Sequence, residues 1–565
     1  MRLRLILASL SLFALTVLSA APVFADTLVV NSNADDAQCS LSHCTLRGAI
    51  GAANRDSDRD TILFNLPEVI RFVCTGATPI TCQGHLVLDP IQPASPLPTI
   101  SRPVTIDGTS QPKYSGSPRV ELRGPAASST LLQLAPGSDG SQIRGLALTN
   151  AAIALDVVSS NNVVTANFVG LDTAAVARGN ITGILVRSDT NLVGGHTAAD
   201  RNVVSANQTV GIQICACGGA LGHANSNTVS GNLIGTDASG TTAVANGEGV
   251  LIAGPSADAN IIGGGPSEGN VISGNQLAGL ELRSTRDDRI GANIIGLNAA
   301  ATAAVPNRGP GVLMTDTKFT ILGQVMGQGQ CTITLPGGGE LTVSCPTVIS
   351  GGNVIAANSG SGVRIVTNSN VRFISIFGNR IGTNFDGASG LGNGLHGIDV
   401  VGGTFAPAID IGGPGLGEGN RIAFNGVFGV HVASGTGGIV IRFNSIGSNG
   451  NLGLAIESLA NFRIMPPVLT SASTTATSTT VQAQVVGRAG QRVDVDFYAS
   501  AACDPSGVGE GERFLSSTAV TPTSDNQALT FSTTLPVVVP AGQVITATTT
   551  EATGGSSGFS GCVTI

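Results

Sequence analysis

The stretch Asn270-Val-Ile-Ser-Gly-Asn275 is one of several near-copies of the same six-residue pattern in this chain. Each copy opens and closes with Asn and carries Val or Ile at its third position. Repetition of a short motif along 565 residues indicates an array of similar units rather than one compact core. The other copies are NVVSAN at 202–207, NTVSGN at 227–232, NVIAAN at 353–358 and NRIAFN at 420–425.

A second repeated motif has Gly followed by an apolar, a variable and another apolar residue. Period-two alternation with a tolerant centre is typical of a strand that has one face in the core and one in solvent. The copies include GILV at 183–186, GIQI at 211–214, GVLI at 249–252, GLEL at 279–282, GVLM at 311–314, GVRI at 362–365, GIDV at 397–400, GVHV at 429–432 and GLAI at 453–456.

Together the two motifs predict stacked coils. Gly and Asn tolerate the left-handed backbone of a sharp corner, and stacked corner Asn amides can hydrogen-bond in a ladder. One coil cannot bury its own apolar face, so many must stack. We therefore expect a parallel β-solenoid, and we prefer this structural explanation of the Asn residues to glycosylation or glycan binding.

Three stretches then resemble bacterial secreted right-handed parallel β-helix proteins with the pectin-lyase-like fold. The stretch 39–64 is similar to the N-terminal motif of CSLREA-type surface proteins, although Gly48 stands where an acid is usual. The segment 104–112 is similar to a first coil of the same group, and the repeats at 150–460 match its general pattern. Separately, the segment 502–511 resembles a module that often ends these proteins. The resemblance implies parallel β-helix repeats in an exported protein, and it implies a fold far more than an activity.

The predicted fold class is all-β, a right-handed parallel β-helix with a short N-terminal capping helix and a C-terminal antiparallel β-sandwich. Leu46, Ala49, Ile50 and Ala53 have the spacing of an amphipathic helix. We expect irregular packing over residues 65–100. The predicted domains are a signal peptide at 1–25, a cap region at 26–100, the β-helix at 101–463 with an insert at about 318–350, and an immunoglobulin-like sandwich at 466–565.

The N-terminus and the charge indicate export. Arg2 and Arg4 precede an apolar run that ends in Val23-Phe24-Ala25, which predicts cleavage before Asp26. No later run is long and apolar enough to span a bilayer. A net charge of −8 without a basic block argues against nucleic acid and anionic membranes as partners. We expect a secreted or cell-surface protein.

Ten cysteines form five neighbouring pairs, as expected in an oxidising compartment. Alternating residues around a Pro-Gly-Gly-Gly turn predict a disulfide-stapled hairpin at 331–345 that projects from the solenoid. Cys215 and Cys217 are only two residues apart, and such residues in a strand can form a disulfide only if a turn brings them together. A zinc site made by these two cysteines and His223 is the alternative. The pairs are Cys39 with Cys44, Cys74 with Cys82, Cys215 with Cys217, Cys331 with Cys345, and Cys503 with Cys562.

Two sets of polar residues are candidates for a site. Asp172, Asp237 and Asp386 recur at one turn two coils apart, too far to share an ion, and are interpreted as turn residues. The outward positions of successive strands give Arg364, Asp399 and His431 on adjacent coils. His431 could act as base, Asp399 could orient it and Arg364 could hold an anionic sugar. The favoured alternative is a charge ladder that only stabilises the sheet.

The sequence predicts an exported structural or adhesive scaffold that binds extracellular polysaccharide or surface proteins. The alternative is a polysaccharide lyase or glycoside hydrolase that cleaves an acidic glycan along the outward sheet. The scaffold is favoured because the carboxylates are scattered, and because the chain has no Trp and only two Tyr to stack on sugar rings. We expect no cofactor. The alternative is Ca²⁺, which a lyase would use to neutralise a substrate carboxylate. The ligand, the oligomeric state and the role of the hairpin stay open.

Overall fold

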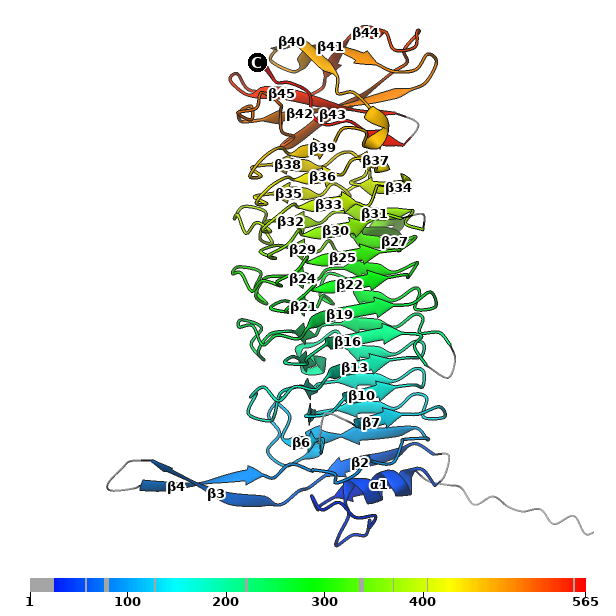
Figure 1. The fold of residues 1–565 in the computed structure, drawn as a ribbon, viewed down its shortest axis with the longest axis vertical. Coiled ribbons are helices and arrows are strands. Elements are labelled where there is room, and N and C mark those ends of the chain that lie inside the picture. The colour runs from blue at the N-terminus through cyan, green and yellow to red at the C-terminus, as the bar shows by residue number, and fades with distance from the viewer. Residues whose placement is uncertain are drawn as a thin grey trace, which may run out of the picture.

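The computed structural model describes residues 25–565 except 56–57, 76–80, 126–128, 219–221, 335–339, 369, 404 and 552–553. The chain forms a tall column of stacked coils with an antiparallel β-domain at its C-terminal end and helix α1 (Leu46–Ala53) at its base (Figure 1). The predicted fold class, a right-handed parallel β-helix with these two ends, is confirmed. The predicted signal peptide lies outside the described residues except for Ala25.

Three parallel sheets run along the column, and most coils add one strand to each. Sheet I contains β7 (Thr130–Leu134), β10 (Ile153–Val157), β13 (Thr182–Val186), β16 (Val210–Cys215), β19 (Glu248–Ala253), β22 (Leu280–Arg283), β25 (Val312–Thr315), β30 (Val363–Val366), β33 (Ile398–Val401), β36 (Val430–Val432) and β39 (Leu454–Ile456).

Sheets II and III complete each coil. Sheet II contains β6 (Val120–Arg123), β9 (Leu146–Thr149), β12 (Phe168–Val169), β15 (Val203–Val204), β18 (Leu233–Ile234), β21 (Val271–Ile272), β24 (Ile294–Ile295), β29 (Val354–Ile355), β32 (Arg380–Ile381), β35 (Arg421–Ala423) and β38 (Ser445–Gly447). Sheet III contains β1 (Thr27–Val30), β2 (Asp60–Phe64), β5 (Val104–Asp107), β8 (Gln142–Arg144), β11 (Val163–Thr165), β14 (Leu192–Gly194), β17 (Thr228–Ser230), β20 (Ile261–Gly263), β23 (Arg289–Gly291), β26 (Ile321–Gly323), β31 (Ile374–Phe377), β34 (Phe405–Ile411) and β37 (Gly437–Ile441).

The repeated motifs explain both the core and the corners. The apolar positions of the sheet I strands, such as Ile184 and Val186, are fully buried and stack in register on those of the next coil. Asn270 and Asn275 belong to two different corner ladders, in which each Nδ2 donates to the Oδ1 of the next rung. The first ladder is Asn167, Asn202, Asn232, Asn270, Asn293, Asn353, Asn379, Asn420 and Asn444. The second is Asn180, Asn207, Asn246, Asn275, Asn307, Asn358, Asn393, Asn425 and Asn449.

The base of the column matches one expectation and corrects another. Thr45 caps α1 by accepting from the Gly48 amide, and the apolar face of α1 is buried. Gly48 is required because a Cβ there would lie 2.0 Å from the Gln38 carbonyl oxygen. Residues 65–100 are not merely irregular, since they contain the antiparallel hairpin of β3 (Glu68–Thr75) and β4 (Thr81–Leu88) (Figure 1). Its alternating pattern was obscured by the prolines that follow.

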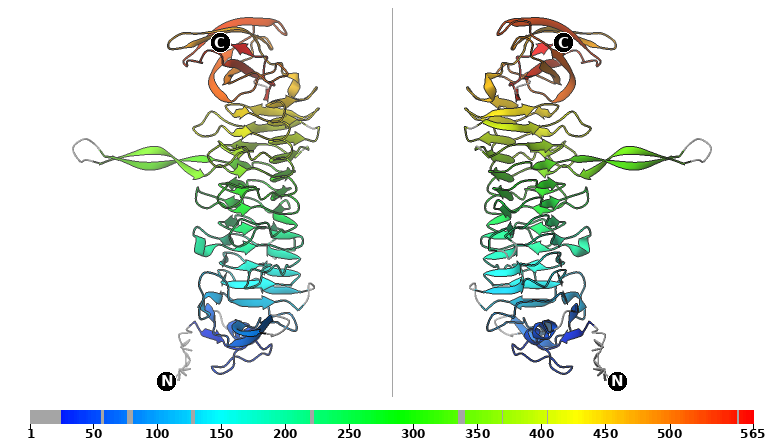
Figure 2. Two further views of the ribbon diagram at one scale, coloured as in Figure 1. Left: turned by 90° about the vertical axis from the view of Figure 1, so that its left-hand side faces the viewer. Right: turned by 90° about the vertical axis from the view of Figure 1, so that its right-hand side faces the viewer.

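A second hairpin, of β27 (Val325–Thr334) and β28 (Glu340–Ser350), projects sideways from the column (Figure 2). Its backbone register sets Cys331 opposite Val343 and Cys345 opposite Gly329. The predicted bonds Cys331–Cys345 and Cys74–Cys82 involve side chains outside the described residues.

Three predicted cysteine pairs are bonded, namely Cys39–Cys44, Cys215–Cys217 and Cys503–Cys562. Strand β16 ends at Cys215 and a turn follows, which meets the condition that the sequence set for that pair. His223 instead pairs with Asp189 at 2.8 Å. The zinc alternative is therefore wrong for these residues.

Two antiparallel sheets form the C-terminal domain and close the column. One contains β40 (Val468–Thr474), β41 (Thr479–Val486) and β44 (Ala528–Leu535). The other contains β42 (Val493–Ser500), β43 (Arg513–Val520), β45 (Val544–Glu551), β46 (Gly555–Ser556) and β47 (Val563–Thr564). Tyr498 and Phe559 join the solenoid core, and Arg442 of the last coils pairs with Asp494 and Asp496.

The 3-10 turns are Gly108–Ser110, Ala198–Asp200 and Asn461–Arg463. Within the described ranges, the structure contains no helix of the length and apolarity needed to cross a membrane.

Candidate functional site

The predicted row of outward side chains exists on sheet I. The register places Arg364 of β30 beside Asp399 of β33, and Asp399 beside His431 of β36. These side chains face outward because the apolar residues on either side of each point into the core. The three residues that period-two reading selected are thus neighbours in space.

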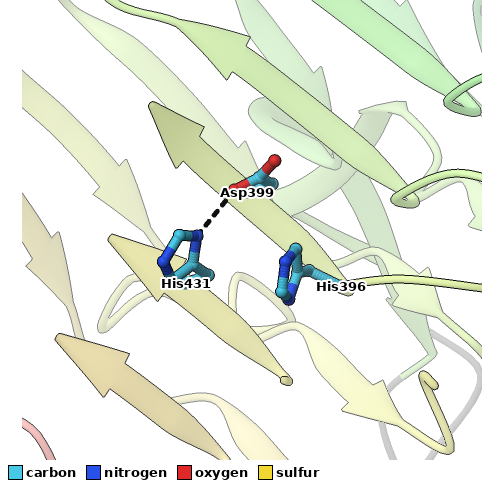
Figure 3. A group of neighbouring side chains, drawn as sticks. All are labelled: His396, Asp399 and His431. Atoms are coloured by element: carbon cyan, nitrogen blue, oxygen red, sulfur yellow. Dashed lines mark hydrogen bonds and ion pairs between the residues drawn. The ribbon is translucent and has the colours of Figure 1, made fainter. Parts of the chain in front are cut away.

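Close polar contacts link the row. Arg364 Nη1 lies 3.3 Å from Asp399 Oδ2, and His431 Nδ1 lies 2.8 Å from Asp399 Oδ1 (Figure 3 shows the His431 contact). Glu457 extends the row, with its Oε1 3.0 Å from His431 Nε2 and its Oε2 accepting from the Ser434 amide. The sequence analysis did not include Glu457 because the last copy of the Gly motif, at 453–456, ends one residue before it, although period two places Glu457 on the outward face.

The two carboxylates change the proton affinity of His431. The hydrogen bond to Asp399, together with the one to Glu457, raises the pKa of His431 above its usual range although burial opposes the shift. The same contact with His431 lowers the pKa of Glu457. Both ring nitrogens of His431 are therefore engaged by carboxylates, and neither is free to take a proton from a substrate. This weakens the role of general base that the sequence suggested.

His396, which the sequence analysis did not select, completes the cluster from the turn before β33 (Figure 3). Its ring stacks on the ring of His431 with centroids 4.8 Å apart and on Phe428 at 5.3 Å. Burial lowers the pKa of His396. Its Nδ1 is buried and has no hydrogen-bond partner among the described residues. We call His396, Asp399 and His431 the histidine cluster.

In two places the residue before the motif Gly contacts the outward centre residue of the next coil. His396 does so with His431. The same relation brings Glu248 to Glu281, and burial plus the shared hydrogen bond raises the pKa of Glu248 to about 7. The position before the Gly is thus the signal that could have revealed His396.

Beside the row, a pocket of about 650 Å³ lies between the last coil and the C-terminal domain. His431, Glu457 and Arg463 are among its few ionisable lining residues, and the rest of the lining is mainly apolar, including Leu454 and Phe559. The histidine cluster therefore borders a space that can admit a ligand.

The first set of acidic candidates behaves as turn residues. Asp172 and Asp237 accept backbone amides within their own turns, two coils apart in sheet II. At the equivalent turn of the later coil, the structure places Asn384 rather than Asp386, because Asn384 follows the turn-closing pair of Thr383 and Gly390. The alignment of Asp386 was therefore wrong by two residues.

A second exposed feature lies at the corner between sheets I and III. Phe319 and Phe373 stack with ring centroids 4.9 Å apart, and each is 47% exposed. Both have left-handed backbones, with φ of 51° and 55°. This conformation is unusual for bulky residues. The other members of this corner column are Asn161, Thr190, Ser226, Ala259, Asp287 and Ala408, all with positive φ.

Cations adjoin the stacked phenylalanines. Lys318 and Arg372 precede Phe319 and Phe373 and lie in register with each other. Within the described ranges, neither forms an ion pair with a carboxylate. Lys318 also lines a pocket of about 320 Å³ with Asp316, whose buried Oδ1 has no partner among the described residues. We call Lys318, Phe319, Arg372 and Phe373 the aromatic platform.

No family model matches this chain, and no curated protein does. Among solved structures it is similar to the Dettilon tailspike protein gp208, with 13% identity, 77% of this chain and 88% of the other covered, and a TM-score of 0.31. It is also similar to pectate lyase Pel9A, with 9% identity, 76% and 80% covered, and a TM-score of 0.24. A mutant tailspike protein of E. coli bacteriophage HK620, in complex with a pentasaccharide, has 9% identity, 84% and 74% covered, and a TM-score of 0.30. Similarities this remote carry no argument about what this chain does.

Proposed function

We propose that the protein is an exported β-helix scaffold that binds an acidic polysaccharide at the aromatic platform. The single observation that carries this proposal is the exposed stack of Phe319 on Phe373. The other named members of this corner column also have positive φ, so the backbone conformation belongs to the coil, whereas two large exposed rings on adjacent rungs do not follow from it. Apolar surface left in solvent at one place supports a role in binding.

The chemistry around the platform supports an anionic sugar as the ligand. Apolar faces of sugar rings pack on exposed aromatic rings, and Lys318 and Arg372 supply positive charge on adjacent coils. The whole chain carries a net charge of −8, so the local cations would set where an acidic chain docks.

Polysaccharide cleavage is the second candidate function. It is favoured by one observation, that His431 lies between the carboxylates of Asp399 and Glu457 beside a pocket. Against it, Asp399 is 3% exposed and already paired with Arg364 and His431. A general acid or base needs a free proton site within reach of the substrate. Because the side chains of this row are already paired with one another, a structural role on the sheet surface fits them better than acid–base catalysis.

The proposal is tested by titrating the chain with polygalacturonate and with neutral dextran and measuring binding by calorimetry. We expect binding to the acidic polymer only, and a loss of roughly tenfold in affinity for Phe319→Ala/Phe373→Ala, because each lost ring contact contributes about 0.5–1.5 kcal/mol. Phe385→Ala is the matched control, since Phe385 is 63% exposed and lies on a different corner. Equal binding by the double variant and the native chain would overturn the assignment of the platform.

A further inference from the structure

We propose that the histidine cluster binds one divalent transition-metal ion of the zinc class through His396, Asp399 and His431. This inference is independent of the proposed glycan binding, because the cluster lies on the outward face of sheet I near the C-terminal domain. The aromatic platform lies at another corner of the column.

The donor atoms are already gathered. One nitrogen of each histidine and one carboxylate oxygen of Asp399 lie within 4.8 Å of one another. Tetrahedral zinc with bonds of about 2.1 Å separates its ligand atoms by about 3.4 Å. A contraction of at most about 1.4 Å would therefore close the site. Two imidazoles and one carboxylate form a ligand set that suits Zn²⁺ and its first-row neighbours.

The unused Nδ1 of His396 is a second and independent observation. This nitrogen is buried without a hydrogen-bond partner among the described residues, which is a costly state for a polar atom. A metal ion would satisfy it. The stack of His396 between Phe428 and His431 holds the ring next to the other two ligands. Sheet stability alone gives no reason for a histidine at this place.

The surrounding groups complete a metal site. With a metal bound, His431 Nε2 would donate to Glu457, and Nδ1, which is hydrogen-bonded to Asp399 Oδ1 in the structure, would release its proton and ligate the metal. A carboxylate behind a metal-bound histidine is the usual means of fixing its tautomer. Arg364 holds the other oxygen of Asp399, so that Asp399 offers one oxygen to the metal. Of the three ligands, His431 also lines the pocket at the last coil, from which water or a ligand could take the fourth position.

The test is metal binding by the chain without an affinity tag, after dialysis against a chelator. We expect calorimetry to show one tight Zn²⁺ site per chain, and Co²⁺ to give the stronger visible absorption of a four- or five-coordinate ion. X-ray absorption at the zinc edge should count two imidazole ligands. Because the cysteines in the described ranges are not free, thiolates there do not compete for the metal.

Variants locate the site. His396→Ala and Asp399→Asn should each weaken Zn²⁺ binding more than tenfold, and Glu457→Gln should weaken it by about tenfold through the lost support of His431. His223→Ala is the matched control, since His223 also pairs with a single carboxylate, and it should bind Zn²⁺ as the native chain does. Thermal unfolding with and without Zn²⁺ checks that each variant is folded. The absence of a stoichiometric site, or equal binding by His396→Ala and the native chain, would overturn the proposal.

Discussion

Replacement of Asn270 by Ala tests whether the corner ladders hold the coils together. Asn270 is fully buried and its side chain makes four hydrogen bonds. Its Oδ1 accepts from the amide and the side chain of Asn232, at 3.0 and 2.9 Å. Its Nδ2 donates to the Val229 carbonyl at 2.8 Å and to Asn293 Oδ1 at 2.9 Å.

The expected cost follows from what each partner loses. The Asn232 amide becomes a buried donor without a partner, at about 1–3 kcal/mol, and each of the other three bonds contributes about 1 kcal/mol. Asn270→Ala should therefore lower the free energy of unfolding by about 4–6 kcal/mol. The Asn232 side chain retains its bonds to the Val193 and Ser230 carbonyls, which keeps the loss from being larger.

Guanidinium-induced unfolding followed by circular dichroism measures the loss. Asn451→Ala is the control, because Asn451 is exposed, and its change should stay within about 0.5 kcal/mol. If Asn270→Ala unfolds at the same denaturant concentration as the control, the ladders do not stabilise the column and the explanation of the repeated motif fails.

Three further changes have defined outcomes. Burial raises the pKa of Asp288 to about 7, so the free energy of unfolding should fall as the pH rises from about 4 to 7, and Asp288→Asn should abolish that fall in a series of thermal melts. Burial and the contact with Glu281 raise the pKa of Glu248 to about 7, so above pH 7 Glu248→Gln should be more stable than the native chain. Equal melting temperatures of variant and native chain at pH 8 would contradict this. Arg442→Ala leaves the fully buried carboxylate of Asp496 without its cation, so the contact of the C-terminal domain with the column should weaken by about 3 kcal/mol or more, measured as faster limited proteolysis between the two.

The sequence predicts those features of the fold that repeat. Asn270 and Asn275 each recur at a fixed place in the coil, so their ladders could be expected from the motif alone. Period two likewise placed Arg364, Asp399 and His431 on the outward face. The alternation of buried and exposed residues is a local property of a strand, which explains why these expectations hold.

Features that depend on how one coil packs on the next could not be predicted from the sequence. His396 lies outside the alternating stretch, and only the stacking of coils brings its ring onto His431. Phe319 and Phe373 are 54 residues apart in the numbering because the hairpin insert separates them, yet they occupy adjacent rungs of one corner.

In the measurement that tests the central claim most directly, the protein is incubated with acidic and with neutral polysaccharides, in the presence of Ca²⁺, of Zn²⁺ or of a chelator. Binding, new reducing ends and ultraviolet-absorbing unsaturated products are recorded together. We predict binding of an acidic polysaccharide without cleavage under every condition, with affinity reduced by Phe319→Ala/Phe373→Ala. Cleavage by the native chain that disappears in His431→Ala or Asp399→Ala would contradict the account and make the row on sheet I an active site.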